Sequence, residues 1–121
     1  MKYYEFCFSP TGGTQKVADT ITKGLTQSAS KVDLTDAKGN FDGILLTKED
    51  VAVIAVPSYS GRVPETAAVR IARLQGHDAS AILICVYGNR AYEDTLVELQ
   101  DIVHQAGFKV VAAVAAIAEH S

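Results

Sequence analysis

The sequence predicts a single α/β domain, residues 1–121, built on a parallel sheet. Strand-like apolar runs alternate with helical patterns along the chain, as in parallel strands joined by right-handed crossovers. Two runs, Val51–Val56 and Lys109–Ile117, are apolar at almost every position, which is typical of strands covered on both faces. A turn rich in hydroxyl groups and glycine, Ser9–Thr14, joins the first strand to the first helix.

Five strands are predicted from these runs. The first is Tyr3–Phe8, and Lys31–Leu34 is a short, half-polar second strand that we expect at a sheet edge. Val51–Val56 and Ala81–Tyr87 follow as continuous apolar strands. Lys109–Ile117, the last, consists almost entirely of Val, Ala and Ile.

Three helices are predicted between the strands. The first spans Gln15–Thr26, the second about Pro64–Leu74, and the third about Ala91–Ala106. Proline is favoured in the first turn of a helix, which supports the start of the second one. Residues 35–50 are interrupted by glycine and asparagine, so we expect at most a short helix there, near Leu45–Asp50.

The composition is that of an ordinary globular protein, with 48% hydrophobic and 21% charged residues. A net charge of -3 gives no basic footprint for nucleic acid or an anionic membrane. No apolar run approaches the roughly 20 residues that span a bilayer. Residues Met1–Glu5 lack the apolar core of a signal peptide. We therefore expect a cytoplasmic protein that binds neither nucleic acid nor membrane.

Both cysteines, Cys7 and Cys85, lie inside apolar strands and are expected to be buried, reduced thiols. Two isolated thiols cannot hold an iron–sulfur cluster, which needs about four ligands. The histidines share no metal-ligand spacing with one another or with the cysteines. We therefore predict no metal site.

The turn Ser9-Pro10-Thr11-Gly12-Gly13-Thr14 is the first of three unusual strand ends. It offers hydroxyl groups, and its glycines let the backbone approach a ligand closely. The helix that follows presents unpaired N–H groups and a positive dipole end to an anion. Because the turn contains no Lys or Arg, hydroxyl and amide groups would hold a phosphate here. A simple helix cap is the alternative, but it would use only one hydroxyl.

The second strand end is the loop Pro57-Ser58-Tyr59-Ser60-Gly61, which Pro64 closes. Tyr59 can present a flat face to a planar ligand. Gly61 would allow the preceding peptide to flip. An ordinary surface turn is the alternative interpretation of this segment.

The third strand end is Tyr87-Gly88-Asn89, with Tyr92 three residues further on. Gly88 and Asn89 expose backbone donors, and the two tyrosines can form a second flat wall. A helix N-terminus capped by Asn89 is the alternative. Because the carboxyl ends of parallel strands meet at one edge, the three loops should lie side by side. Together they suit a planar cofactor that carries a phosphate.

This arrangement resembles the flavodoxin family, whose phosphate-loop pattern, Thr/Ser-x-Thr-Gly-x-Thr, matches Ser9–Thr14 at every defined position. The loops Pro-x-Tyr-x-Gly-Arg-x-Pro and Gly-Asn-Arg-x-Tyr resemble a branch found ahead of bacterial-type ferredoxin domains. The resemblance covers essentially the whole chain and implies sheet order 2-1-3-4-5 and non-covalent FMN. No tryptophan is present, so a tyrosine would replace the stacking tryptophan of many flavodoxins.

The resemblance also implies roles for single residues. The FMN phosphate would be bound by Ser9, Thr11, Gly12, Gly13 and Thr14. One side of the isoalloxazine ring would be lined by Pro57, Ser58, Tyr59, Ser60 and Gly61, with Tyr59 stacked on the ring. The other side would be lined by Tyr87, Gly88, Asn89 and Tyr92. In relatives, a peptide before a glycine turns its carbonyl toward flavin N5 on reduction, and Ser60–Gly61 is the matching peptide.

The function that the resemblance implies is electron transfer through bound FMN. No catalytic side chain is assigned, because the cofactor carries the redox chemistry, so an electron carrier is favoured over an enzyme with its own substrate. Its partner would be another redox protein, of ferredoxin type in the branch named above. An FMN-dependent reductase of a small substrate such as a quinone would use the same site. A non-redox phosphate-binding module is a third alternative, although the P-loop and dinucleotide patterns are absent.

The flavodoxin-like fold closes with a fifth helix, but this sequence stops at Ser121, directly after the last strand. The crossover rule places the first and fifth helices on the same face. One face of the third to fifth strands is therefore expected to lack cover, and large exposed apolar patches are rare on monomers. We expect either a domain truncated at its C-terminus, without the last helix, or a homodimer in which a second subunit covers this face.

Overall fold

The computed structural model describes residues 1–36, 41, 43–88 and 92–117. Within these ranges the chain forms a five-stranded parallel sheet of order β2-β1-β3-β4-β5, which confirms the predicted fold class and strand order. The elements are β1 (Tyr3–Cys7), α1 (Gly13–Leu25), β2 (Ala29–Asp33), β3 (Val51–Pro57), α2 (Glu65–Ala72), β4 (Ser80–Tyr87), α3 (Tyr92–Gln105) and β5 (Lys109–Ile117).

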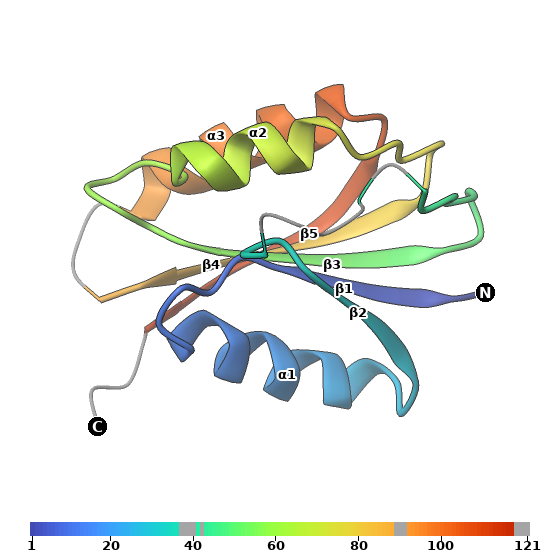
Figure 1. Cartoon of the computed structure of the whole chain (residues 1–121), viewed down its shortest axis with the longest axis horizontal. Helices are drawn as coiled ribbons and strands as arrows, with labels where there is room; N and C mark the ends of the chain where they lie inside the picture. Colours follow the sequence, from blue (N-terminus) through green and yellow to red (C-terminus); the bar gives the residue numbers. More distant parts are fainter. Residues whose placement is uncertain (37–40, 42, 89–91, 118–121) are drawn as a thin grey trace.

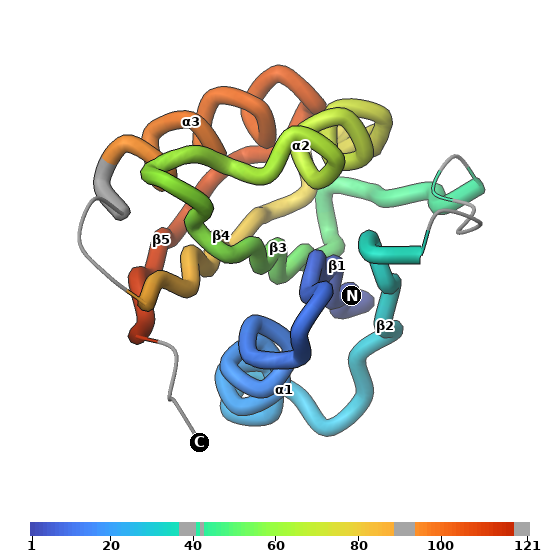
Figure 2. The backbone as a smooth tube through the Cα atoms, turned by 60° about the vertical axis from the view of Figure 1, so that its left-hand side comes forward, coloured from blue at the N-terminus to red at the C-terminus, as the bar shows by residue number. Residues whose placement is uncertain are grey.

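The described helices lie in two layers, one on each face of the sheet. Helices α2 and α3 pack side by side over one face, and α1 lies alone on the other (Figure 1). The view in Figure 2 shows the same arrangement, with β2 and β5 at opposite edges of the sheet. None of the described helices is long and apolar enough to cross a membrane.

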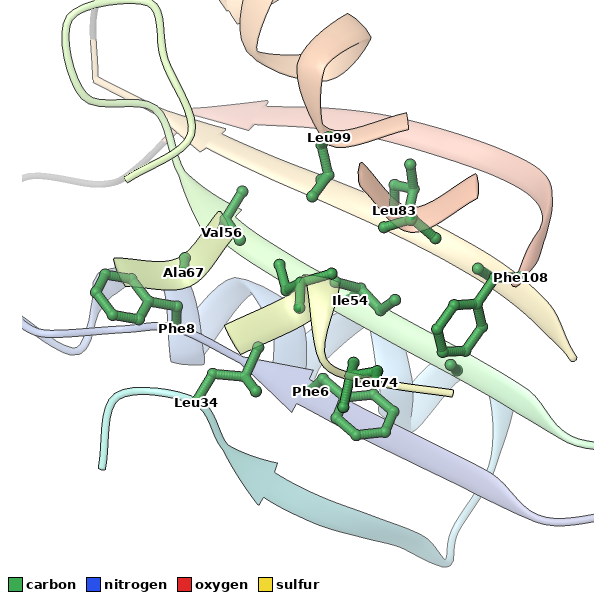
Figure 3. Close-up of a cluster of buried hydrophobic side chains, with 14 of the residues drawn as sticks. Phe6, Phe8, Leu34, Ile54, Val56, Ala67, Leu74, Leu83, Leu99 and Phe108 are labelled. Carbon is green, nitrogen blue, oxygen red and sulfur yellow. The ribbon is translucent and has the colours of Figure 1, made fainter. Parts of the chain in front are cut away.

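The main core lies between the sheet and helices α2 and α3. Phe6, Ile54 and Leu83 project from three neighbouring strands into the layer between the sheet and the helices, where Leu99 of α3 also lies (Figure 3). All four side chains are fully buried. Burial of one large apolar side chain contributes about 1.5–3 kcal/mol relative to exposure. This core holds the sheet rigid beneath the loops at its ends.

A smaller core joins the other face of the sheet to α1. It contains Cys7, Val53, Ile84 and Ala18. Both cysteines are unpaired and buried, as predicted. Burial raises the pKa of Cys7 to about 12 and that of Cys85 to about 11, so neither thiol is a nucleophile at neutral pH.

The short helix predicted near Leu45–Asp50 is wrong. This segment forms turns, and Leu46 is buried in the main core. The Asp50 carboxylate accepts hydrogen bonds from the backbone N–H groups of Thr47 (2.9 Å) and Lys2 (3.0 Å). These bonds hold the chain in a turn because they tie backbone donors to a side chain rather than to helical carbonyls.

Strand β5 is partly exposed, as expected for a strand that lacks a covering helix on one face. Val111, Val114 and Ile117 are exposed to 55%, 37% and 66%. The uncovered area is also narrower than predicted, because α1 packs over Val53 of β3 and Ile84 of β4 and leaves β5 beyond its reach. The third to fifth strands were predicted to share one uncovered face. In the structure this uncovered face is limited to β5 and to the partly buried Ile82 of β4 beside it.

Glu5, in the middle of β1, is a buried carboxylate beneath α1. It is 1% exposed, and its Oε2 accepts a hydrogen bond from Gln15 Nε2 (2.7 Å), while its Oε1 has no partner within the described structure. Gln15 Nε2 also donates to Asp19 Oδ1 (2.8 Å), which forms an ion pair with Lys31 (3.0 Å). Burial is the main cause that raises the pKa of Glu5.

We expect Glu5→Gln to stabilise the protein at pH 7 by about 1 kcal/mol, because it removes a buried charge and keeps an acceptor for Gln15. A raised carboxyl pKa favours folding at low pH, and that contribution is lost as pH rises from the unfolded-state pKa through the folded-state pKa. The advantage of Glu5→Gln should therefore disappear at acid pH. Urea denaturation from pH 4 to pH 8 measures this, with the exposed Glu49→Gln as the control. A loss of stability in Glu5→Gln at pH 7 would contradict the account.

Candidate functional site at the carboxyl edge of the sheet

Three strand ends lie at the same edge of the sheet, because every strand runs in the same direction. In Figure 1 the ends of β1, β3 and β4 meet at the left of the molecule, where α1 begins. Backbone hydrogen bonds continue past the strands and tie them together. Phe8 N–H donates to Ala55 C=O (3.0 Å), and Ser58 N–H donates to Val86 C=O (2.9 Å). The three predicted loops therefore start from one rigid edge.

The first loop ends at Gly12, which adopts a left-handed conformation with φ 91° and is the N-cap of α1. A left-handed residue reverses the chain direction here, and glycine is the residue that does so without steric cost. A Cβ atom at Gly12 or Gly13 would meet no other atom within 4 Å. The space in front of the helix is therefore open.

Ser9 supports this turn from inside. Its Oγ accepts a hydrogen bond from the Gln15 N–H (3.0 Å), and its own N–H donates to Thr35 Oγ1 (2.7 Å). Ser9 thus caps one of the unpaired donors of α1, as the alternative interpretation of the turn requires. The N–H groups of Gly13 and Thr14, in the same helical turn, have no acceptor within the described residues.

The remaining groups of the turn differ in exposure. Thr11 and Gly12 are exposed, Gly13 is half-buried, and Thr14 is buried at 5% exposure. The first turn of α1 contains no acidic residue, so the positive end of the helix is not neutralised from within the helix. This turn is therefore a suitable place for an anion.

The second loop contains a tight hairpin turn. Tyr59 and Arg62 exchange two backbone hydrogen bonds of 3.0 Å, and the two residues between them, Ser60 and Gly61, have φ values of 52° and 76°. Two positive φ values at the central positions are characteristic of a type I′ turn. The turn leaves Tyr59 46% exposed, so its ring is available as a flat surface.

Glu98 of α3 holds this turn in place. Its Oε1 accepts hydrogen bonds from Arg62 Nε (3.1 Å) and the Val63 N–H (2.8 Å), and its Oε2 accepts one from Arg62 Nη2 (3.0 Å). The bidentate pair with Arg62 lowers the pKa of Glu98. Glu98 was not predicted from the sequence, because nothing in a helical pattern indicates which surface glutamate faces a loop 35 residues away.

Ser58 points inward instead of toward the edge. Its hydroxyl lies 2.7 Å from Thr95 Oγ1, a side chain of α3 that is fully buried. Pro57, the last residue of β3, is also buried. These two residues therefore position the hairpin, whereas Tyr59, Ser60 and Arg62 are exposed.

The third loop is described only at its ends. Tyr87 ends β4 and is half-buried, and Gly88 is exposed. The predicted ligand Asn89 and the side chain of Tyr92 lie outside the described residues. The structure thus brings Tyr87 and Gly88 to the same edge as the other two loops.

A cavity of about 900 Å³ lies at the opposite edge of the sheet, beside the N-terminus of β5. Its lining mixes cationic and acidic side chains, among them Lys48, Lys109, Asp78 and Asp101. This mixture of charges does not favour an anion. The described part of the chain also contains no cluster of His, Cys, Asp or Glu that could hold a metal ion. We therefore place the candidate site at the carboxyl edge.

The sequence matches no protein-family model and no curated protein. Several solved structures share its fold. A flavoprotein in complex with FMN from Lactobacillus acidophilus aligns with a TM-score of 0.75 at 11% identity, over 94% of this chain and 92% of the other. A flavodoxin, a WrbA-like protein from Agrobacterium tumefaciens, aligns with a TM-score of 0.73 at 19% identity, over 99% and 85% of the two chains.

An azoreductase from Bacillus anthracis aligns with a TM-score of 0.62 at 11% identity, over 95% of this chain and 87% of the other. These similarities establish that the fold is flavodoxin-like. The fold therefore occurs in proteins described both as flavodoxins and as reductases.

We expect Gly12→Ala to destabilise the protein by about 1–2 kcal/mol, because a Cβ atom disfavours the left-handed conformation even where space is open. Gly13→Ala is the matched control: Gly13 lies in the helix with no positive φ, and alanine is a better helix former than glycine. Chemical denaturation of both variants measures the difference. Equal stability of the two variants would contradict the role assigned to Gly12.

We expect Glu98→Gln to destabilise the protein by about 1 kcal/mol at pH 7, because it breaks the charged pair that anchors the hairpin. Since the pKa of Glu98 is lowered in the folded state, the carboxylate stabilises the fold above its unfolded-state pKa. This contribution is lost as pH falls through the lowered pKa, so the two proteins should converge in acid. Thermal unfolding of the native protein and Glu98→Gln at pH 7 and at acid pH tests this difference in stability. Asp101→Asn, exposed on the same helix, is the control.

Proposed function

We propose that this chain binds FMN at the carboxyl edge of the sheet and carries electrons between redox proteins. The observation that carries the proposal is the turn before α1, where a left-handed Gly12 opens a helix N-terminus with unpaired N–H groups and no acidic residue. Helix N-termini of this kind bind phosphate. A protein of this fold in complex with FMN supports the choice of ligand.

The phosphate of FMN would be held by Ser9, Thr11, Gly12, Gly13 and Thr14. Thr11 is exposed and its hydroxyl can donate directly to a phosphate oxygen. Ser9 accepts the Gln15 N–H, and its own hydroxyl proton still remains to be donated. Capping the helix and binding the phosphate are therefore compatible roles for Ser9.

The ring of FMN would lie between the second and third loops. Tyr59 would stack on one side, and the hairpin formed with Ser60 and Gly61 would place backbone groups at the ring edge. Pro57 and Ser58 would support this hairpin from within the fold. Tyr87, Gly88, Asn89 and Tyr92 would line the other side of the ring.

Bound FMN supplies reversible transfer of one or two electrons through its ring system. The residues of the chain bind the phosphate, hold the ring flat against Tyr59 and present the Ser60–Gly61 peptide to it. We assign no acid–base side chain to the proposal. The partner in such a role is another redox protein that approaches the exposed edge of the ring.

A reductase of a small molecule such as a quinone is the second candidate, and the fold shared with an azoreductase favours it. Such an enzyme would oxidise NADH or NADPH in the presence of an acceptor, whereas an electron carrier alone would not. Measurement of nicotinamide oxidation by the FMN-loaded protein, with and without a quinone, separates the two functions. Rapid oxidation would replace the electron-carrier proposal by the reductase.

We expect Thr11→Val to weaken FMN binding by about 10-fold to 100-fold, because a hydrogen bond to a charged group contributes about 1.5–3 kcal/mol. Thr20→Val is the matched control. Thr20 is an exposed residue of α1, about two helical turns after the loop Ser9–Thr14. In the described structure its hydroxyl donates a hydrogen bond only to the Lys16 carbonyl (2.9 Å). Titration of the apoprotein followed by flavin fluorescence gives both affinities.

An apoprotein that is folded by circular dichroism but binds no FMN would refute the proposed function. Equal loss of affinity in the two threonine variants would show that the phosphate is not held at Thr11. Riboflavin, which lacks the phosphate, serves as a further probe, and it should bind Thr11→Val and the native protein equally well.

A further inference from the structure

The two edges of the sheet are built differently. The edge strand β2 has five residues, and Ser30, Lys31 and Asp33 are exposed on it. Short length and charged side chains prevent an edge strand from pairing with another chain. At the other edge, β5 has nine residues, and Lys109 at its start is its one charged residue.

The edge formed by β5 carries no device that would block pairing after its first residues. One irregularity interrupts its register with β4, opposite Ala81 and Ile82, and the strand is regular from Ala112 to Ile117. No proline and no charged side chain occurs in that stretch. Ala112, Ala113 and Val114 are exposed in that stretch, which forms the edge of the sheet. A long, uncharged apolar edge of this kind is a template for another strand.

We propose that β5 pairs with β5 of a second copy of this chain, antiparallel, across a two-fold axis through Val114. Such an interface is isologous, because the same strand serves on both sides. The two sheets would then form one continuous ten-stranded sheet.

The faces of β5 are compatible with this register, and Val114 lies near the middle of the regular stretch Ala112–Ile117. Ala112, Val114 and Ala116 pair with alternate residues of β4 on the α1 side of the sheet. A two-fold axis perpendicular to the sheet keeps the α1 sides of both copies together, and directly opposite residues of an antiparallel pair point to the same face. With the axis at Val114, this residue meets Val114 of the second copy, and Ala112 meets Ala116. The small alanine side chains allow the two strands to approach.

A second copy packed face to face on the α1 side is not favoured. On the side of α1 next to β5, Lys16, Thr20 and Lys23 are exposed and line a cavity together with Ala116 and Ile117. A second copy packed on this face would bury these polar side chains against the apolar side chains of β5. Burial of unpaired lysine charges is unfavourable. Edge pairing avoids this cost because α1 remains in solvent.

The interface is small. One strand pair with its flanking side chains buries less than the roughly 1,200 Å² of standard interfaces, so we expect a dimer that dissociates in the micromolar range. Sedimentation velocity from about 1 µM to about 100 µM covers that range. The mass should rise with concentration to twice the 12.9 kDa of one chain.

Disulfide trapping tests the register directly. The native thiols Cys7 and Cys85 are buried and do not interfere. Opposed Cα atoms of an antiparallel pair lie about 4.5–5.5 Å apart, within the range that a disulfide spans. Val114→Cys should therefore form a covalent dimer on mild oxidation. Ala112→Cys and Ala116→Cys should each form no cross-link alone, and an equimolar mixture of them should cross-link.

Ser30→Cys, at the exposed position of the opposite edge strand, is the control and should not cross-link. If Val114→Cys fails to fold, the mixture of the two alanine variants still tests the register. A native protein that remains monomeric at about 100 µM would overturn the proposal. Cross-linking of Val114→Cys no greater than that of Ser30→Cys would also overturn it. Both experiments are done with and without FMN. The test of the dimer therefore gives a result even if the protein binds no FMN.

Discussion

All five strands run in the same direction, and the candidate site depends on this constraint. Because β1 lies between β2 and β3, its carboxyl end is surrounded by the ends of its neighbours. The turn before α1, the Tyr59 hairpin and the start of the third loop therefore share one edge, although they are far apart in the sequence. The large core between the sheet and α2 and α3 keeps these strand ends fixed relative to one another.

Within that edge, backbone groups carry most of the proposed binding chemistry. Gly12 adopts a left-handed conformation at the start of α1. Ser9 Oγ accepts the N–H of Gln15 and leaves the N–H groups of Gly13 and Thr14 available to a ligand. The hairpin at Ser60 and Gly61 is fixed by its own two hydrogen bonds and by Glu98 from the far side. An arrangement of this kind attracts a phosphate without a cationic side chain in the turn, because the helix end supplies the positive potential.

The local sequence patterns predicted much of this, and the failures have a common cause. Apolar runs predicted β1, β3, β4 and β5, a short half-polar run predicted β2, and glycine with hydroxyl residues predicted the turn at Gly12. Glu98 and Thr35 escaped prediction because their contacts with Val63 and Ser9 join segments 35 and 26 residues apart. The exposed face of β5 was expected, but the expectation that β3 and β4 would share it was wrong, since α1 covers Val53 and Ile84. Burial depends on which helix covers a strand, and the apolar pattern of a single strand does not give that information.

The most direct measurement is an amide NMR titration of the ¹⁵N-labelled apoprotein with FMN. The account predicts that the N–H signals of Gly12, Gly13 and Thr14 move most and move downfield, as expected for amides that donate to a phosphate. Signals near the opposite edge, such as those of Lys48 and Lys109, should stay in place. Largest shifts at that opposite edge, or no shift in the turn before α1 while FMN binds, would contradict the central claim.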